Sequence, residues 1–152
     1  MKTPEKTIII VEATIHAPVE TVWKLWTDPR YIIHWNHASD DWHTTRAEND
    51  LVTGGRFISR MEARDGSQGF DFSGKYTRVE LNKQIEITLD DGRNMQVLFF
   101  PRGDVTAVTE AFEAEQENTV ELQKEGWQVI LNNFKKYAEA HLTVRNNEQA
   151  HG

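Results

Sequence analysis

The chain has 152 residues, the size of one ordinary domain, and carries a formal net charge of −7 at pH 7. That charge disfavours binding to nucleic acid or to anionic lipid, because both are negative themselves. The lack of cysteine excludes disulfides, thiolate catalysis and cysteine-ligated zinc, and no apolar run approaches the ~20 residues that span a bilayer. We therefore expect a single cytoplasmic domain over residues 1–152 that binds neither nucleic acid nor a membrane.

The first part of the chain predicts one strand followed by two short helices. From Thr7 to His16 apolar and polar residues alternate, which is typical of a strand with one buried face. Pro18 then stands where the first turn of a helix tolerates proline, ahead of apolar residues at helical spacing. Asp28 and Pro29 repeat this start signal, so a second short helix follows the first.

The middle of the chain predicts a β-meander, because turn signals divide it into short alternating segments. The predicted strands span residues 42–46, 55–63, 69–80, 84–89, 94–101 and 104–114. With the first strand they make seven.

A long amphipathic helix is predicted next. Asn118 with Glu121 three residues later forms a capping-box signal, and one apolar stripe then continues for about six turns, to about His141. Residues 144–152 are polar and lack this periodicity, so we expect a core of about residues 7–141 and a frayed tail. A long amphipathic helix must bury its stripe, and the sheet is its only large partner. We therefore predict an α+β helix-grip fold, in which a curved antiparallel sheet wraps around the last helix.

Two glycines interrupt predicted elements. Gly126 lies inside the long helix, where glycine costs about 1 kcal/mol relative to alanine, and Gly74 lies inside a strand. Two interpretations are open for both: a feature of a pocket or of a close contact, or the simpler one of helix–sheet packing at Gly126 and a bulge at Gly74.

Several short motifs together resemble one known family. They occupy residues 16–23, 35–36, 39–43, 54–57, 61–63, 112–115, 126–128, 130–131 and 133–137. Over about residues 7–141 the chain is similar to the bacterial single-domain branch of the activator of heat-shock protein 90 ATPase homologue family. That family belongs to the START-like (SRPBCC) superfamily, with polyketide cyclases and the birch-pollen-allergen type of lipid binders. The resemblance implies a helix-grip fold holding a small hydrophobic molecule between the sheet and the long helix.

Two positions depart from the family pattern. His37 stands where an aromatic residue is usual and Ser59 where a larger ring is common, which implies a more polar pocket mouth and a larger interior. The other expected pocket residues fall on the strand faces and the helix stripe that oppose each other in this fold. The predicted ligand-binding residues are Trp35, His37, Phe57, Ser59, Met61, Phe70, Phe72, Phe112, Trp127, Ile130 and Leu131.

Glu110 is the candidate catalytic residue. It shares a strand face with Val108 and Phe112, so it is placed to point into the pocket with a pKa raised by burial, as a general acid or base requires. Two other arrangements are open. In the first, this face of the strand is the outer one and Glu110 is solvated. In the second, Glu110 points inward and pairs with Arg60 or Arg78.

A metal site is not expected, although His34, His37, Asp40, Asp41 and His43 lie close together in the sequence. The three histidines fall on a helix end, in a loop and at a strand start, so convergence on one ion would need a special loop fold. The sequence also contains no glycine-rich phosphate loop, nucleophile elbow or paired-carboxylate spacing. We therefore expect no cofactor.

Three functions are consistent with these patterns. The first is binding of a small hydrophobic or amphipathic molecule. The second is a cyclase- or hydrolase-like enzyme that uses Glu110, with His37 as the candidate for a second group. The third is a chaperone-interaction module, which rests on the family name alone, because the eukaryotic activator also uses an N-terminal domain for which this chain has no room. An apolar cavity of roughly 300–1,000 Å³ would support the first two, and a solid core would exclude both.

Overall fold

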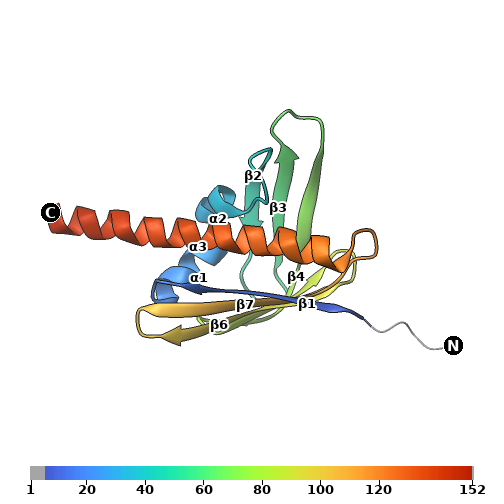
Figure 1. Ribbon diagram of the computed structural model, residues 1–152. Helices are drawn as coiled ribbons and strands as arrows, with labels where there is room; N and C mark the ends of the chain where they lie inside the picture. The colour runs from blue at the N-terminus through green and yellow to red at the C-terminus, as the bar shows by residue number, and fades with distance from the viewer. Residues whose placement is uncertain (1–5, 152) are drawn as a thin grey trace.

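The computed structural model describes the backbone of residues 6–151 and the side chains of residues 6–141. Within this range the chain forms one seven-stranded antiparallel sheet and three helices (Figure 1). The elements in chain order are β1 (Ile8–Ile15), α1 (Val19–Thr27), α2 (Pro29–Trp35), β2 (Trp42–Asn49), β3 (Arg56–Ala63), β4 (Gly69–Glu80), β5 (Gln84–Leu89), β6 (Asn94–Arg102), β7 (Val105–Glu113) and α3 (Val120–His151). The seven predicted strands are confirmed, and β2 is three residues longer than predicted.

The sheet is a meander that the first strand extends at one edge. Its order is β1-β7-β6-β5-β4-β3-β2, so each strand from β2 to β7 pairs with the next, and β1 adds to the edge beside β7. The pairing shifts between Thr44 and Arg46 in β2 and between Tyr76 and Arg78 in β4. Such irregularities bend strands, and Figure 1 shows α3 lying across one face of the bent sheet, with α1 and α2 beside it. The helix-grip fold is confirmed.

The two short helices begin where the sequence predicts. Pro18 precedes α1, and the side chain of Asp28 caps α2 by accepting a hydrogen bond from the Arg30 N–H at 3.0 Å. Asp28 thereby bonds one of the backbone N–H groups that a helix leaves unpaired in its first turn.

The long helix differs from the prediction at both ends. Its cap is Thr119, whose Oγ1 accepts the Leu122 N–H at 3.1 Å, while Asn118 bonds instead to the carboxylate of Glu115. At the other end, α3 continues to His151, whereas we predicted helix to about His141 and a frayed tail from residue 144. The apolar periodicity does stop there, but no glycine or proline interrupts the sequence and most of its residues permit helix.

The core lies between the concave face of the sheet and the middle of α3. Phe134 and Leu131 of α3 are fully buried, and the Phe134 ring meets those of Trp26 and Trp35 with centroids 4.9 Å apart in each pair. These rings fill the space between α3 and the short helices. Beside the N-terminal part of α3, which includes Gly126, the space is not filled. Among the described helices, none combines the length and hydrophobicity needed to cross a membrane.

The two glycines inside elements meet different surroundings. A Cβ at Gly74 would lie 2.7 Å from the Thr88 carbonyl oxygen and 3.0 Å from the Phe57 ring, so Gly74 permits a close approach between neighbouring strands. The bulge interpretation of Gly74 is wrong, because the shift in pairing follows Tyr76. A Cβ at Gly126 would meet nothing within 4 Å, so the interpretation of Gly126 as a close-packing contact is wrong as well.

These surroundings predict opposite effects for the same substitution. Gly74→Ala should lower the free energy of unfolding by about 1–3 kcal/mol, because the methyl group clashes with backbone that has no room to move. Gly126→Ala should raise it by about 0.5–1 kcal/mol, because alanine favours helix and the methyl group enters open space. Urea denaturation of both variants checks this, and a change of the same sign in both would contradict it.

Candidate functional site

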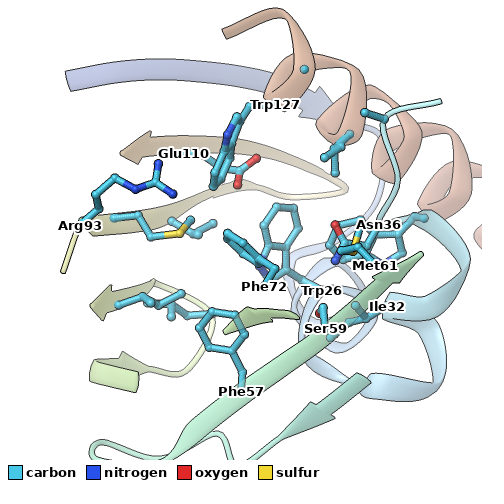
Figure 2. Close-up of a pocket in the computed structure, with 18 of the residues that line it drawn as sticks. Trp26, Ile32, Asn36, Phe57, Ser59, Met61, Phe72, Arg93, Glu110 and Trp127 are labelled. Atoms are coloured by element: carbon cyan, nitrogen blue, oxygen red, sulfur yellow. The ribbon is translucent and has the colours of Figure 1, made fainter. Parts of the chain in front are cut away.

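A cavity of about 440 Å³ lies between the sheet and the N-terminal half of α3. Figure 2 shows its walls, which are mainly aromatic and aliphatic side chains. The cavity is not sealed, because two lining residues, Phe70 at 50% exposure and Leu122 at 56%, remain half exposed and mark where it opens. Its size falls within the roughly 300–1,000 Å³ that small-molecule sites occupy.

Strand alternation decides which β3 side chains face the cavity, and one hydrogen bond fixes the ring of Trp35 in its wall. Phe57, Ser59 and Met61 follow each other at every second position of β3 and therefore all face the cavity. Ser59 is buried and small, so it leaves space where a ring would fill it. Elsewhere on the wall the Trp35 indole N–H donates to the Leu25 carbonyl at 3.0 Å, which holds the Trp35 ring in place at the end of α2.

The structure brings nine of the twelve predicted site residues to the cavity. They are Trp35, Phe57, Ser59, Met61, Phe70, Phe72, Glu110, Trp127 and Ile130. That these residues bind a ligand stays a prediction.

Three predicted residues do not line the cavity. Phe112 lies beneath Trp127, with stacked rings 3.9 Å apart between centroids, so Trp127 covers it. Leu131 is fully buried in the core, because one step along a helix turns it away from the face of Ile130. His37 lies in the loop after α2, where its carbonyl accepts a hydrogen bond from Asn133 at 2.6 Å.

Further lining residues come from positions that we did not predict as ligand-binding. Alternation alone places the inner faces of β5 and β6 on the wall, and that signal was available in the sequence. The polar groups come mostly from turns and helix ends, whose conformation periodicity does not reveal. These additional residues are Trp26, Ile32, Asn36, Ala38, Glu48, Asn49, Tyr76, Ile85, Ile87, Arg93, Met95, Val97, Glu115, Asn118, Leu122, Gln123 and Gly126.

Glu110 is a buried acidic residue of the cavity wall. It is 4% exposed and faces inward, with Val11 of β1 and Val97 of β6 directly opposite it in the two neighbouring strands. Its carboxyl group has no hydrogen-bond or ion-pair partner among the side chains that the structure describes. Figure 2 shows Glu110 among the residues of the cavity wall. This burial raises the pKa of Glu110 to about 8, because an apolar surrounding disfavours the charged form.

Both alternative arrangements of Glu110 are therefore wrong. Its face of β7 is the inner one, since Thr106 and Val108 are fully buried. Neither arginine reaches it: Arg60 pairs with Asp71 at 3.4 Å, and Arg78 pairs with its strand neighbour Glu80.

A second glutamate on the same strand, Glu113, shows that the surroundings of a carboxyl group decide the direction of its pKa shift. Glu113 accepts a hydrogen bond from the Asn94 N–H at 2.8 Å and forms an ion pair with Lys6 at 3.1 Å. These partners, the Asn94 N–H first, hold the pKa of Glu113 below its ordinary value. Glu110 lacks such partners, so its pKa moves in the opposite direction.

Polar groups of the β5–β6 turn and of the start of α3 already have hydrogen-bond partners within the protein. Arg93 donates to the Asp91 carboxylate at 2.8 Å and to the Glu113 carbonyl at 3.3 Å. Gln123 accepts the Glu115 N–H and donates to the Asn118 carbonyl, both at 2.8 Å. This part of the cavity wall is thus polar but already hydrogen-bonded.

The histidines do not form a metal centre in the part of the chain that the structure describes. No group of three His, Cys, Asp or Glu side chains comes together there as metal ligands would. His34 instead stacks on the ring of Tyr137, with centroids 5.8 Å apart.

Comparison with known proteins adds independent evidence of kinship. Residues 16–139 match the family model described as activator of Hsp90 ATPase homolog 1-like protein. An AHSA1-like protein from Aeromonas hydrophila is 49% identical and superposes with a TM-score of 0.83, over 89% of this chain and 94% of that one. A protein from Cytophaga hutchinsonii is 47% identical, with a TM-score of 0.76 over the same shares of 89% and 94%.

More distant structures share the fold alone. A protein from Chromobacterium violaceum has a TM-score of 0.78 at 20% identity, over 88% of this chain and 98% of that one. No curated protein matches the chain. With the family model matched over most of the helix-grip fold and two solved structures nearly half identical, the chain belongs to the activator of Hsp90 ATPase homolog 1-like family.

Proposed function

We propose that this protein binds a small, mainly apolar molecule in the cavity between the sheet and the N-terminal half of α3. The observation that carries the proposal is the cavity itself, about 440 Å³ of space lined mainly by aromatic and aliphatic side chains. Protein interiors are close-packed and hold few voids larger than a water molecule, because empty space forfeits dispersion contacts. Proteins of the START-like fold commonly bind hydrophobic ligands, which fits an occupant of this space.

Small residues keep the space open at a cost to stability. Gly126 faces the cavity from inside a helix, where alanine would be more favourable by about 1 kcal/mol. Ser59 faces it from β3 in place of a larger side chain. A Cβ at Gly126 would meet nothing within 4 Å, so Gly126 is not needed for close packing and supports a role in leaving room for a ligand.

The mouth of the cavity also suits an apolar molecule. Phe70 and Leu122 present half-exposed apolar surface beside the opening, and Phe70 packs against Trp42 with ring centroids 5.8 Å apart. Exposed apolar surface beside a cavity is typical of ligand-binding sites.

Filling the cavity from the helix side tests the proposal. Wild-type protein should bind the uncharged fluorescent probe N-phenyl-1-naphthylamine saturably, with one site per chain. Gly126→Leu should weaken this binding by at least about tenfold, because the new side chain occupies the space that the probe needs. The matched control is Lys124→Leu, which places the same side chain on the exposed face of α3.

Fluorescence titration gives the dissociation constants, and circular dichroism verifies that both variants fold. Wild-type affinity retained in Gly126→Leu, or lost equally in Lys124→Leu, would contradict the proposal.

The two alternative functions have less support. A cyclase- or hydrolase-like enzyme requires a second polar group that acts with Glu110. No described side chain bonds to Glu110, and His37 lies outside the lining. A chaperone-interaction module still rests on the family name alone. Binding is the function that the geometry supports best.

A further inference from the structure

We infer that the molecule held in this cavity carries one basic nitrogen, whose positive charge pairs with the carboxylate of Glu110. The inference rests on the proposed function and narrows it to one class of ligand, small aromatic or alicyclic amines.

The surroundings of Glu110 leave its carboxyl group without a partner inside the protein. Its neighbours on the same face of the sheet are Val11, Val97, Val108 and Phe112, all of them buried. An unpaired buried carboxyl group costs stability, and an apolar side chain would pack this site better. A ligand that approaches Glu110 from the cavity can supply the missing partner.

The charges around the cavity favour a cation over an anion. The lining contains three carboxyl groups, those of Glu48, Glu110 and Glu115, and one guanidinium group, that of Arg93. Arg93 is already bonded to the Asp91 carboxylate at 2.8 Å, and Glu115 accepts hydrogen bonds from Asn118, so both have partners within the protein. Glu110 has none among the described side chains. The net charge of −7 on the whole chain acts in the same direction.

The aromatic walls add a second attraction for a positive charge. Trp127 lies over Phe112, the same-face neighbour of Glu110, and meets Phe72 with ring centroids 5.9 Å apart. The face of an aromatic ring attracts a cation within about 6 Å of its centroid, most strongly when the ring is that of tryptophan. Trp127 and Phe72 line the same cavity as Glu110, so its wall offers aromatic rings as well as a carboxylate to an ammonium group.

The pH dependence of the binding affinity distinguishes an amine from an uncharged ligand. Burial raises the pKa of Glu110 to about 8, so the group is largely protonated at neutral pH. A cation binds its ionised form, so binding releases a proton and the affinity rises with pH up to about 8. An uncharged ligand that accepts a hydrogen bond from the protonated form shows the reverse, a constant affinity that falls above about pH 8.

Few other titratable groups face the cavity. They are Glu48 of β2, Tyr76 of β4, Arg93 of the β5–β6 turn and Glu115 before α3. Burial raises the pKa of Tyr76 above its ordinary value, which places it further from neutral pH. The lining residues of β3, β5, β6 and α3 are apolar or uncharged, as are the residues of β1 and β7 that flank Glu110, and no histidine is among the lining residues.

The experiment compares two probes that differ in one group, 2-(1-naphthyl)ethylamine and 2-(1-naphthyl)ethanol. Isothermal titration calorimetry at pH 6, 7 and 8, in buffers of different ionisation enthalpy, gives both affinity and proton release. The amine should bind roughly fiftyfold more tightly at pH 8 than at pH 6, and release close to one proton at pH 6. Glu110→Gln should weaken amine binding at pH 8 by at least about tenfold and remove its pH dependence, while alcohol binding stays within about threefold.

Glu12→Gln is the matched control, because Glu12 adjoins Val11 on β1 but is exposed, on the face away from the cavity. It should bind both probes as the wild type does. Glu110→Met provides a second variant without the carboxyl group, in case the glutamine variant does not fold. Binding of the alcohol with no rise in amine affinity between pH 6 and pH 8 would overturn the inference and leave the proposed function standing. Binding of neither probe would contradict both.

Discussion

Glu110→Gln should abolish most of the loss of stability that the wild-type protein undergoes as the pH rises from about 4.5 to 8. The pKa of Glu110 is about 8 in the folded protein, against an ordinary value of 4.5 that applies when the chain is unfolded. Between these values the folded state holds a proton that the unfolded state has released, so raising the pH favours unfolding. The contribution is fully present below pH 4.5 and is lost as the pH rises toward 8. Its size is on the order of 5 kcal/mol, from about 1.4 kcal/mol per pH unit over this interval.

Urea denaturation at several pH values, without ligand, measures this effect. The stability of Glu110→Gln relative to the wild type should increase steadily from pH 5 to pH 8, because glutamine does not titrate. Glu12→Gln, which changes an exposed carboxyl group on the neighbouring strand, should follow the wild type throughout. Parallel curves for Glu110→Gln and the wild type would show that Glu110 is not held in an apolar surrounding.

Phe134→Ala should lower the free energy of unfolding by about 3–5 kcal/mol, the usual range for removing a buried phenylalanine ring. Phe134 is fully buried and its ring meets those of Trp26 and Trp35, so it joins α3 to α1 and α2. Its loss would leave a hole beside the ligand cavity that the rigid tryptophan rings cannot refill.

The matched control is Phe100→Ala, because Phe100 lies on β6 and is 53% exposed. Its stability should stay within about 0.5 kcal/mol of the wild type, as is usual for surface substitutions. Urea denaturation of both variants gives the comparison. Similar losses in the two would contradict the view that α3 is anchored through Phe134.

The fold could be predicted from local patterns because its elements carry strong local signals. Strand alternation located β4 and β5 at their observed bounds, and Asp28 with Pro29 marked the start of α2. The start of α3 was less predictable, because Asn118 and Thr119 are both good caps. Only the hydrogen bonds of the folded chain distinguish them: Thr119 bonds to the helix while Asn118 bonds to Glu115.

The cavity could be predicted only in part, because it depends on which side chains cover which. Alternation places both Glu110 and Phe112 on the inner face of β7, yet Trp127 stacks on Phe112 and leaves Glu110 facing the space. The polar part of the wall comes from Arg93 and Glu115, which lie in connections between elements. The lack of a partner for Glu110 follows from the whole arrangement, so no sequence motif announces it.

The most direct test of the central claim maps a bound probe onto the protein by nuclear magnetic resonance. Isotope-labelled protein is titrated with N-phenyl-1-naphthylamine while the backbone amide and tryptophan indole signals are followed. The proposed function predicts that the signals of Trp26, Trp35 and Trp127 shift and saturate at one equivalent of probe, because all three line the cavity. Shifts confined to exposed apolar residues of the outer surface, such as Ile8 and Phe100, would contradict it.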